Sequence, residues 1–286
     1  MAEVSPVSSA RPLAILPGYS DSPATQMEPT GCAVDTYLSS GTTPPRHRHD
    51  SYELFILYSG AAVLSTQHGR EVLTPGDAAL FYGGTLHGAR SVTGMYRRTA
   101  IHFVSDRLST AISDQLPAAG EGLRAFSLPA ETLEKLLRDA KGLRALSDAG
   151  DAKRTTMMLE KIFRSIEDDM SSRRPRRHLP PILQAVVQYM VQHPKQTRST
   201  GEIASKFYIS EGHLYRLFQQ YLRCTPQKLW LYLKIESACD MLLTGKSIDE
   251  AAKGAGFATR RGFERAFLRI TGLSPASYRD MVVQSL

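Results

Sequence analysis

The sequence predicts an α+β protein in two parts: a β-rich N-terminal part followed by helices, and an all-α C-terminal part with two helix-turn-helix motifs. Three observations predict this. Short apolar runs broken by Gly and Pro fill residues 32–104, helical spacing replaces them after Asp106, and one helix-turn-helix pattern occurs twice near the C-terminus. The expected boundaries are residues 1–170, a linker at 171–180, and residues 181–286.

The apolar runs of the first part have the length and spacing of strands. Examples are 53–58, 61–64, 71–73, 78–82 and 99–104. Closely spaced strands separated by turns are typical of a β-sandwich or a small barrel. Residues 1–30 are rich in Pro, Ser and Ala and are expected to be irregular.

Two amphipathic helices are expected between the strands and the linker. Their apolar residues recur at helical spacing: Leu133, Leu136, Leu137 and Leu143 in the first, and Met158, Leu159, Ile162, Phe163 and Ile166 in the second. Such helices cover a barrel or pair with a second subunit, so a homodimer is one hypothesis. The linker that follows is interrupted by proline and basic, with four arginines in ten residues.

The repeat in the second part is the most specific feature of the chain. Ala204 is followed by Leu214 and Phe218, and Ala252, 48 residues later, is followed by Phe263 and Phe267. Each copy has a short helix with a small residue at its packing point, a tight turn and a second helix. This is the pattern of a helix-turn-helix, whose second helix lies in the major groove of DNA.

The charge of the chain is divided unevenly between its parts. Residues 171–286 carry 18 Lys and Arg against 8 Asp and Glu, whereas residues 1–170 carry 17 against 20. A basic C-terminal part is expected of a protein that neutralises DNA phosphates. No signal peptide or membrane-spanning run is apparent, so we expect a cytoplasmic protein without membrane contact, with reduced core thiols at Cys32, Cys224 and Cys239.

The positions between the apolar residues of each second helix must face outward, and these are the candidate DNA-binding residues. They are Glu211, Gly212, Tyr215, Arg216 and Gln219 in the first copy, and Arg260, Arg261, Glu264 and Arg265 in the second. Arg216 and Arg265 occupy equivalent places, and arginine reads guanine edges through two hydrogen bonds. Gly212 has no side chain to read a base and is expected to permit close backbone approach.

These motifs resemble the DNA-binding domain of the AraC/XylS family of bacterial transcription regulators. The resemblance rests on Ile203-Ala204, Thr225-Pro226, Gly256-Phe257 and Gly272 with Ser274-Pro275, among other positions. It implies a sequence-specific regulator of transcription, usually an activator, whose partners are double-stranded DNA, a small-molecule effector and RNA polymerase.

Residues 41–60 fit the first cupin motif: Gly41, then His47 and His49, then Glu53, then Gly60. A partial second motif runs from Gly76 to His87, with Tyr82 in place of the usual proline. The N-terminal part therefore resembles a cupin β-barrel, as in the sensor half of many AraC-type regulators. The resemblance implies a pocket for the effector, and the candidate ligand-binding residues are Arg46, His47, His49, Glu53 and His87.

The role of this cluster stays open among three alternatives, one of which is a purely structural barrel without a ligand. His47, His49 and Glu53 share strand parity and, with His87, could hold Fe(II), Mn, Ni or Zn as a divalent metal cofactor. Alternatively, the same side chains hydrogen-bond a small molecule without metal. A metal-dependent cupin enzyme, such as an oxygenase with a DNA-binding tail, is the competing function, although we expect no enzyme and no catalytic residue.

Overall fold

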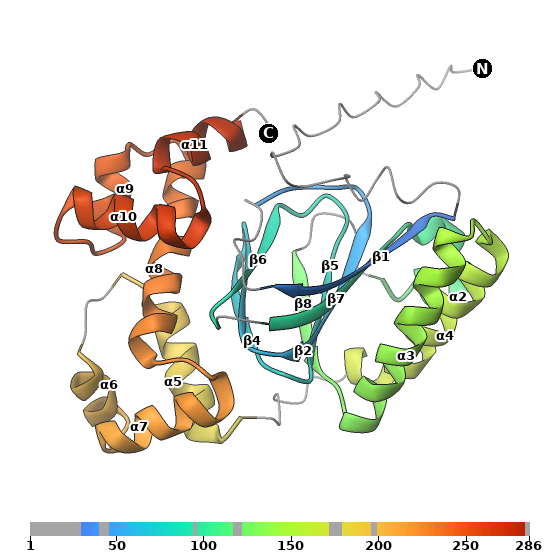
Figure 1. Ribbon diagram of the computed structural model, residues 1–286, viewed down its shortest axis with the longest axis horizontal. Helices are drawn as coiled ribbons and strands as arrows, with labels where there is room; N and C mark the ends of the chain where they lie inside the picture. Colours follow the sequence, from blue (N-terminus) through green and yellow to red (C-terminus); the bar gives the residue numbers. More distant parts are fainter. Residues whose placement is uncertain are drawn as a thin grey trace.

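The structure, a computed structural model, describes residues 30–39, 46–93, 96–116, 122–171, 179–195 and 199–283. Within these residues it has the expected order, with a β-rich part before an all-α part (Figure 1). Residues 1–29 of the expected irregular segment and residues 172–178 of the expected linker lie outside the described residues.

The described strands form two antiparallel sheets, which we call the barrel. The five-stranded sheet has the order β1 (Cys32–Ser39), β7 (Tyr96–Phe103), β2 (Tyr52–Ser59), β5 (Asp77–Phe81) and β8 (Leu123–Ser127). The three-stranded sheet has the order β4 (Gly69–Leu73), β3 (Ala62–Thr66) and β6 (His87–Ser91). Strand β8 lies in the region where only helices were expected. It is an edge strand in which only Phe126 is buried, so it has no apolar alternation to mark it.

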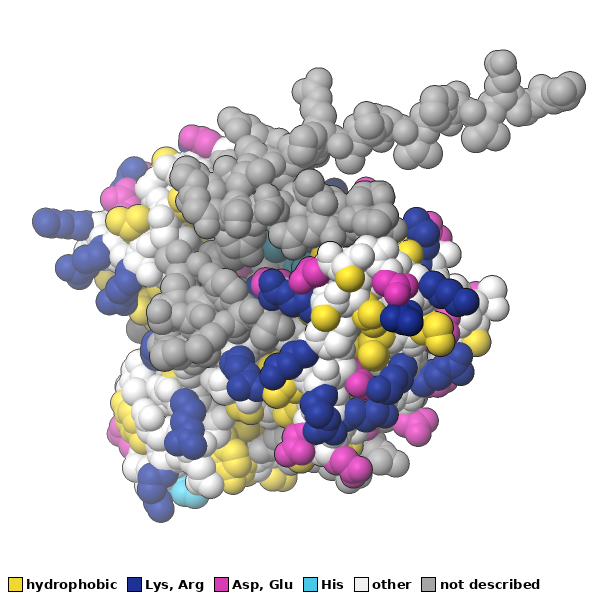
Figure 2. Space-filling model, turned by 45° about the vertical axis from the view of Figure 1, so that its right-hand side comes forward, with side chains coloured by type: hydrophobic (Ala, Val, Ile, Leu, Met, Phe, Trp, Pro, Cys, Tyr) yellow, Lys and Arg dark blue, Asp and Glu magenta, His cyan; other side chains and the backbone are white. Residues whose placement is uncertain are grey.

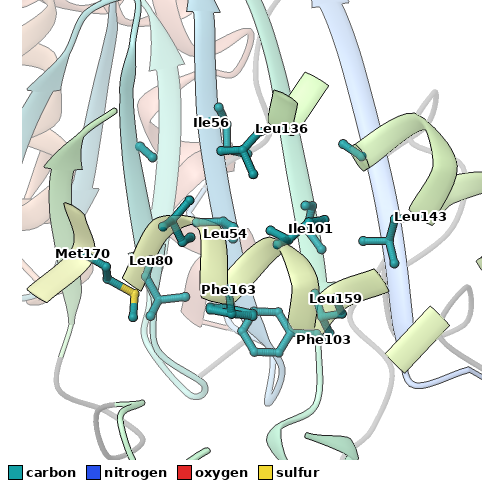
Figure 3. Packing of buried hydrophobic residues seen from close by; sticks show 14 of the residues in the cluster. Leu54, Ile56, Leu80, Ile101, Phe103, Leu136, Leu143, Leu159, Phe163 and Met170 are labelled. Atoms are coloured by element: carbon teal, nitrogen blue, oxygen red, sulfur yellow. The ribbon is translucent and has the colours of Figure 1, made fainter. Parts of the chain in front are cut away.

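The five-stranded sheet is buried on both faces because helices cover its outer side. Phe55 and Phe81 point between the sheets, whereas Leu54 and Ile56, one position away, point outward. The outer residues pack against α3 (Ala130–Asp148) and α4 (Ala152–Ser171), as Figure 3 shows. The expected helical stripes are thus engaged within the chain itself: Leu136, Leu143, Leu159, Ile162, Phe163 and Ile166 all lie in this core. A homodimer formed through those residues would have to open it.

The outer surfaces of α3 and α4 carry charges of both signs. Figure 2 turns these helices toward the viewer and shows Lys and Arg side chains interspersed with Asp and Glu. Several are paired, for example Lys161 with Asp139 and Arg164 with Glu160. This face therefore lacks the single-sign field expected of a DNA-binding surface. Two short helical turns, η1 (Ser105–Arg107) and α2 (Thr110–Ser113), connect β7 to the segment before β8.

The all-α part contains both expected helix-turn-helix motifs. After α5 (Pro181–Gln192), the first consists of α6 (Thr200–Lys206) and α7 (Glu211–Leu217), extended by a π-helical turn, η2 (Phe218–Leu222). The second consists of α9 (Ile248–Gly254) and α10 (Arg260–Thr271), and α11 (Pro275–Val283) follows it. The two first helices begin with the same capping box: Ser199 with Glu202, and Ser247 with Glu250.

Helix α8 (Pro226–Leu243) joins the two motifs and is buried around most of its circumference. Its N-terminal residues, including Leu229 and Leu233, pack in the core of the first motif. Its C-terminal residues, including Ala238 and Leu242, pack in the core of the second. One helix therefore fixes how the two motifs lie relative to each other.

The barrel contacts the all-α part through an apolar patch and a charged cluster. Val63 and Val72 of the three-stranded sheet, with Ala61 just before β3, share a core with residues of α5 such as Val186. Beside this patch, the carboxylate of Glu236 on α8 lies 2.6 Å from Nε of Arg90 and 3.1 Å from Nη2 of Arg46.

The environment of Glu236 keeps it ionised although it is buried. Burial alone would raise the pKa of this carboxyl, but the adjacent Arg90 and Arg46 more than offset that effect and lower the pKa to about 2. The contact between the two parts of the chain therefore depends on a charged, buried carboxylate.

We predict that Gly256→Ala destabilises the second motif. Gly256 has a φ of 75°, and a Cβ atom there would lie 2.5 Å from the carbonyl oxygen of Lys195. The free energy of unfolding, measured by urea denaturation, should fall by about 1–3 kcal/mol. Gly212→Ala is the matched control, because it lies in α7 with no atom near the added methyl group, and alanine favours a helix. A loss of stability in the control equal to that at Gly256 would contradict the steric explanation.

We also predict that Glu236→Gln lowers the free energy of unfolding by about 3 kcal/mol at neutral pH, because two buried guanidinium groups lose their carboxylate. A carboxyl whose pKa is lowered by folding stabilises the fold above its unfolded pKa and loses this contribution as pH falls through its folded pKa. The difference from the wild type should hold between pH 5 and 8 and shrink as pH falls from about 4.5 toward 2. Glu134→Gln, on the exposed side of α3, should change little at any pH. A difference that varies between pH 5 and 8 would count against this assignment.

Candidate functional site

Four of the expected ligand residues meet inside the barrel. Glu53 is carried by β2 and His87 by β6, while His47 and His49 lie on the segment before β2. His47 and His87 are joined by two backbone hydrogen bonds of 2.9 Å, which bring the first motif against β6. One ligand atom from each of the four side chains lies within 4.8 Å of the others.

Backbone carbonyls fix the orientation of two of the imidazole rings. Nδ1 of His87 lies 2.8 Å from the carbonyl oxygen of Thr85, and Nδ1 of His49 lies 2.8 Å from that of Ser51. A carbonyl oxygen only accepts, so both Nδ1 atoms donate, and both rings turn Nε2 toward the cluster. These Nε2 atoms lie 3.0 Å and 3.5 Å from Oε2 of Glu53. Nε2 of His49 is buried and has no hydrogen-bond partner.

The carboxylate of Glu53 is charged although it is buried. Burial alone would raise the pKa of Glu53, but the adjacent His102, His49 and His87 hold it well below its usual range. Burial lowers the pKa of His102 itself to about 4, so that ring is neutral at neutral pH. The hydrogen bond between Nε2 of His87 and Oε2 of Glu53 favours the ionised form of this carboxylate.

The residues present fit a divalent metal ion. Imidazole nitrogens and one carboxylate are ligands for Zn, Fe, Ni or Mn, and metal affinity requires them deprotonated. Metal-binding histidines usually donate their second ring N–H to a backbone carbonyl or carboxylate, as His49 and His87 do here. The uncompensated Nε2 atom of His49 points to the same requirement for an electron-pair acceptor.

The structure adds one residue to the site and places another elsewhere. His102 of β7 lies directly opposite Glu53 in the sheet, with its ring 5.0 Å from that of His49. Sequence reasoning missed it, because its place follows only from the β2–β7 register. Arg46, expected among the ligand residues, directs its guanidinium toward Glu236 and Asp240 of α8.

The candidate DNA-binding residues lie on the outer faces of α7, η2 and α10. Those that are exposed are Glu211, Gly212, Arg216, Gln219, Arg260, Arg261 and Arg265, and those that are half-buried are Tyr215 and Glu264. Arg260 is paired with Asp249 and Glu264, and the hydroxyl of Tyr215 contacts Gln227. The remaining exposed arginines, Arg216, Arg261 and Arg265, are thus the best placed to reach an incoming nucleic acid.

In the described part of the chain, no helix is both long and apolar enough to cross a bilayer.

Comparison with known proteins agrees with both halves of this architecture. Residues 34–179 match the AraC-like ligand binding domain, and residues 203–281 match a helix-turn-helix domain. The transcriptional regulator GbdR of Pseudomonas aeruginosa is 30% identical over 42% of this chain and 34% of its own length. The transcriptional activator RclR of Escherichia coli is 29% identical over 37% of this chain and 38% of its own length. The matched segments therefore span only about a third of these relatives.

Solved structures give matches of two kinds. ToxT of Vibrio cholerae, crystallised with an unsaturated fatty acid, is 14% identical and covers 88% of this chain and 96% of its own, with a TM-score of 0.36. The C-terminal domain of AraT, a response regulator of Geobacillus stearothermophilus, is 30% identical and covers 36% of this chain and 86% of its own, with a TM-score of 0.35. Since the ligand-binding domain alone accounts for about half of the sequence and the helix-turn-helix domain follows it, the chain belongs to the AraC family of regulators.

Proposed function

We propose that this protein is a ligand-responsive, sequence-specific DNA-binding regulator of transcription that acts in the cytoplasm. The observation that carries the proposal is the combination of two exposed candidate reading helices with a largely enclosed cluster of potential ligand side chains in one chain. An effector bound in the barrel would shift the population of DNA-binding states. Family precedent favours activation, with RNA polymerase as a further partner and a homodimer as the assembled form.

The two motifs suggest how DNA would be read. Because α7 and α10 belong to one chain and are held by α8, a single subunit would contact two major-groove segments about one helical turn apart. The elements of such a site would be unlike each other, since the residues on the two helices differ. A dimer would then bind two such sites as repeats.

The protein's DNA site is best found by sequencing the genomic fragments that the purified chain retains. We expect an enriched motif of two elements that Arg216→Ala/Arg265→Ala abolishes. Arg265→Ala alone should weaken binding to this motif by about 1–3 kcal/mol, with a smaller effect on random DNA. Arg164→Ala on α4 is the control, since it removes an exposed arginine from the face of mixed charge. Equal loss on all DNA would make Arg265 a phosphate contact, and the absence of any enriched motif would contradict the proposed function.

We further propose a divalent metal ion as the occupant of the barrel, held by His47, His49, Glu53 and His87. The support is the orientation of His49 and His87, whose Nε2 atoms both face Glu53, together with the unpartnered Nε2 atom of His49. A bound ion would supply a Lewis-acidic centre to which an oxygen-donor effector can attach.

Metal uptake tests this second proposal. The purified chain should bind a single Zn²⁺ ion in a calorimetric titration, and His49→Ala should lower the affinity by at least about 100-fold. His68→Ala is the control, because His68 is exposed in a turn outside the cluster. Binding that survives His49→Ala, or no binding by the wild type, would leave the pocket to a metal-free effector. Turnover of a substrate that stops in the same variant would instead favour the enzyme alternative.

A further inference from the structure

Three arginines of the barrel reach α8, the helix between the two motifs. Arg46 and Arg90 contact Glu236, while Arg46 and Arg70 contact Asp240, one turn further along. The side chains of Arg46, Arg90 and Glu236 are 2%, 6% and 3% exposed, so water does not compete for these pairs. The barrel therefore holds the C-terminal half of α8, the half that packs in the core of the second motif.

Arg90 also contacts the second reading helix directly. Its Nη1 donates to the carbonyl oxygen of Ile270 at 3.0 Å, one residue before α10 ends at Thr271. Carbonyls of the last turn have no partner within their helix, and the negative end of the helix dipole favours a cation there. A single side chain of β6 thus contacts both α8 and α10.

The same strand also carries a residue of the ligand cluster, His87. Successive residues of a strand point to opposite faces, so His87 faces the ligand cluster whereas Gly88 and Arg90 face the all-α part. The segment paired with it repeats this arrangement: His47 faces the cluster, and its neighbour Arg46 faces α8. The backbone bridge between His47 and His87 joins the two segments.

The close packing at Gly88 couples these segments sterically. A Cβ atom at Gly88 would lie 3.2 Å from Cγ and 3.5 Å from Cα of Arg46. The segment carrying His47 and the strand carrying His87 therefore cannot move independently. A displacement of either backbone is passed to the guanidinium groups of Arg46 and Arg90.

The buried ion pairs are better suited to transmitting a movement of the barrel to the all-α part than to holding the two parts together. Apolar residues already hold the barrel against α5, and a buried ion pair adds little net stability over an apolar contact of the same size. Its geometry is more demanding, since paired guanidinium and carboxylate groups require short distances and a defined direction. A small shift of the barrel strands would therefore change the positions of α8 and α10, while the apolar patch keeps the two parts together.

We propose that Arg46 and Arg90 transmit the state of the His47/His49/Glu53/His87 pocket to the second helix-turn-helix motif. An occupant that draws His47 and His87 together moves the two arginines, and these move Glu236 and the C-terminal end of α10. The packing of α10 against α8 changes in consequence, and with it the fit of α10 to its DNA element. This inference rests on the proposed function and specifies how that function is regulated.

A double-mutant cycle on the full chain tests the transmission without an identified effector. His87→Ala alters the pocket, Arg90→Met removes the proposed connection while keeping side-chain bulk, and both are combined. The readout is the amide hydrogen exchange of residues 267–271, the end of α10. We expect His87→Ala to change this exchange about tenfold in the wild-type background and to add nothing in the Arg90→Met background. Arg46→Met should reduce the coupling in the same way.

Arg97→Met is the matched control, because Arg97 lies on β7 of the same barrel and contacts the ring of Tyr58 instead of the all-α part. In that background the effect of His87→Ala should persist in full. The inference is overturned if His87→Ala leaves α10 unchanged, or if its effect is the same with and without Arg90. It is also overturned if Arg97→Met abolishes the coupling as Arg90→Met does.

DNA affinity measured on the same proteins separates the two proposals. If the cycle is coupled and the wild type binds no specific DNA, the proposed function fails and the transmission stands. If DNA is bound specifically but the cycle is additive, the transmission fails and the proposed function stands.

Discussion

The alternation of side chains along a strand governs this molecule, because the central strands of the barrel have a different neighbour on each face. On β2, Leu54 and Ile56 pack under α3 and α4, while Glu53 and Phe55 point between the sheets. The same rule makes β6 a two-sided element, with a ligating ring on one side and a guanidinium on the other. A shift of one residue in the register of either strand would exchange these roles. The core, the ligand cluster and the contact between the two parts therefore all depend on the same strand register.

Local patterns predicted most of the fold and the composition of the pocket. The repeat of Ala204 at Ala252 located both helix-turn-helix motifs. His47 and His49 reach the cluster from the segment before β2, so the strand parity that suggested their common direction does not apply to them. His102 was missed because its place depends on which residue of β7 pairs with Glu53, and the sequence of neither strand alone determines that register. The contacts of Arg46 depend on how the two parts of the chain dock, about which neither sequence motif carries information.

The distribution of charge also determines how the two parts of the chain contact each other. The C-terminal part is strongly basic overall, yet it places Glu236 and Asp240 on the side of α8 that meets the barrel. The barrel part, slightly acidic overall, supplies three arginines there. At the contact, the C-terminal part thus presents acidic residues and the barrel presents basic ones, each opposite in sign to the net charge of its own part. The basic residues of α7 and α10 remain exposed, and the contact surface differs in charge from the surface of these two helices.

The burial of α8 on nearly all sides has a consequence for the integrity of the chain. Its C-terminal half has no solvent-facing stripe of its own, since Ile235, Ala238 and Leu242 are covered by α9, α10 and α11. A chain cut short after this helix, by a premature stop codon or by a protease acting in the following turn, would retain an apolar helix without its cover. Such a product would expose a continuous hydrophobic surface and tend to aggregate. Loss of the last forty or so residues would therefore deplete the protein from the cell instead of leaving a regulator with one functional DNA-binding motif.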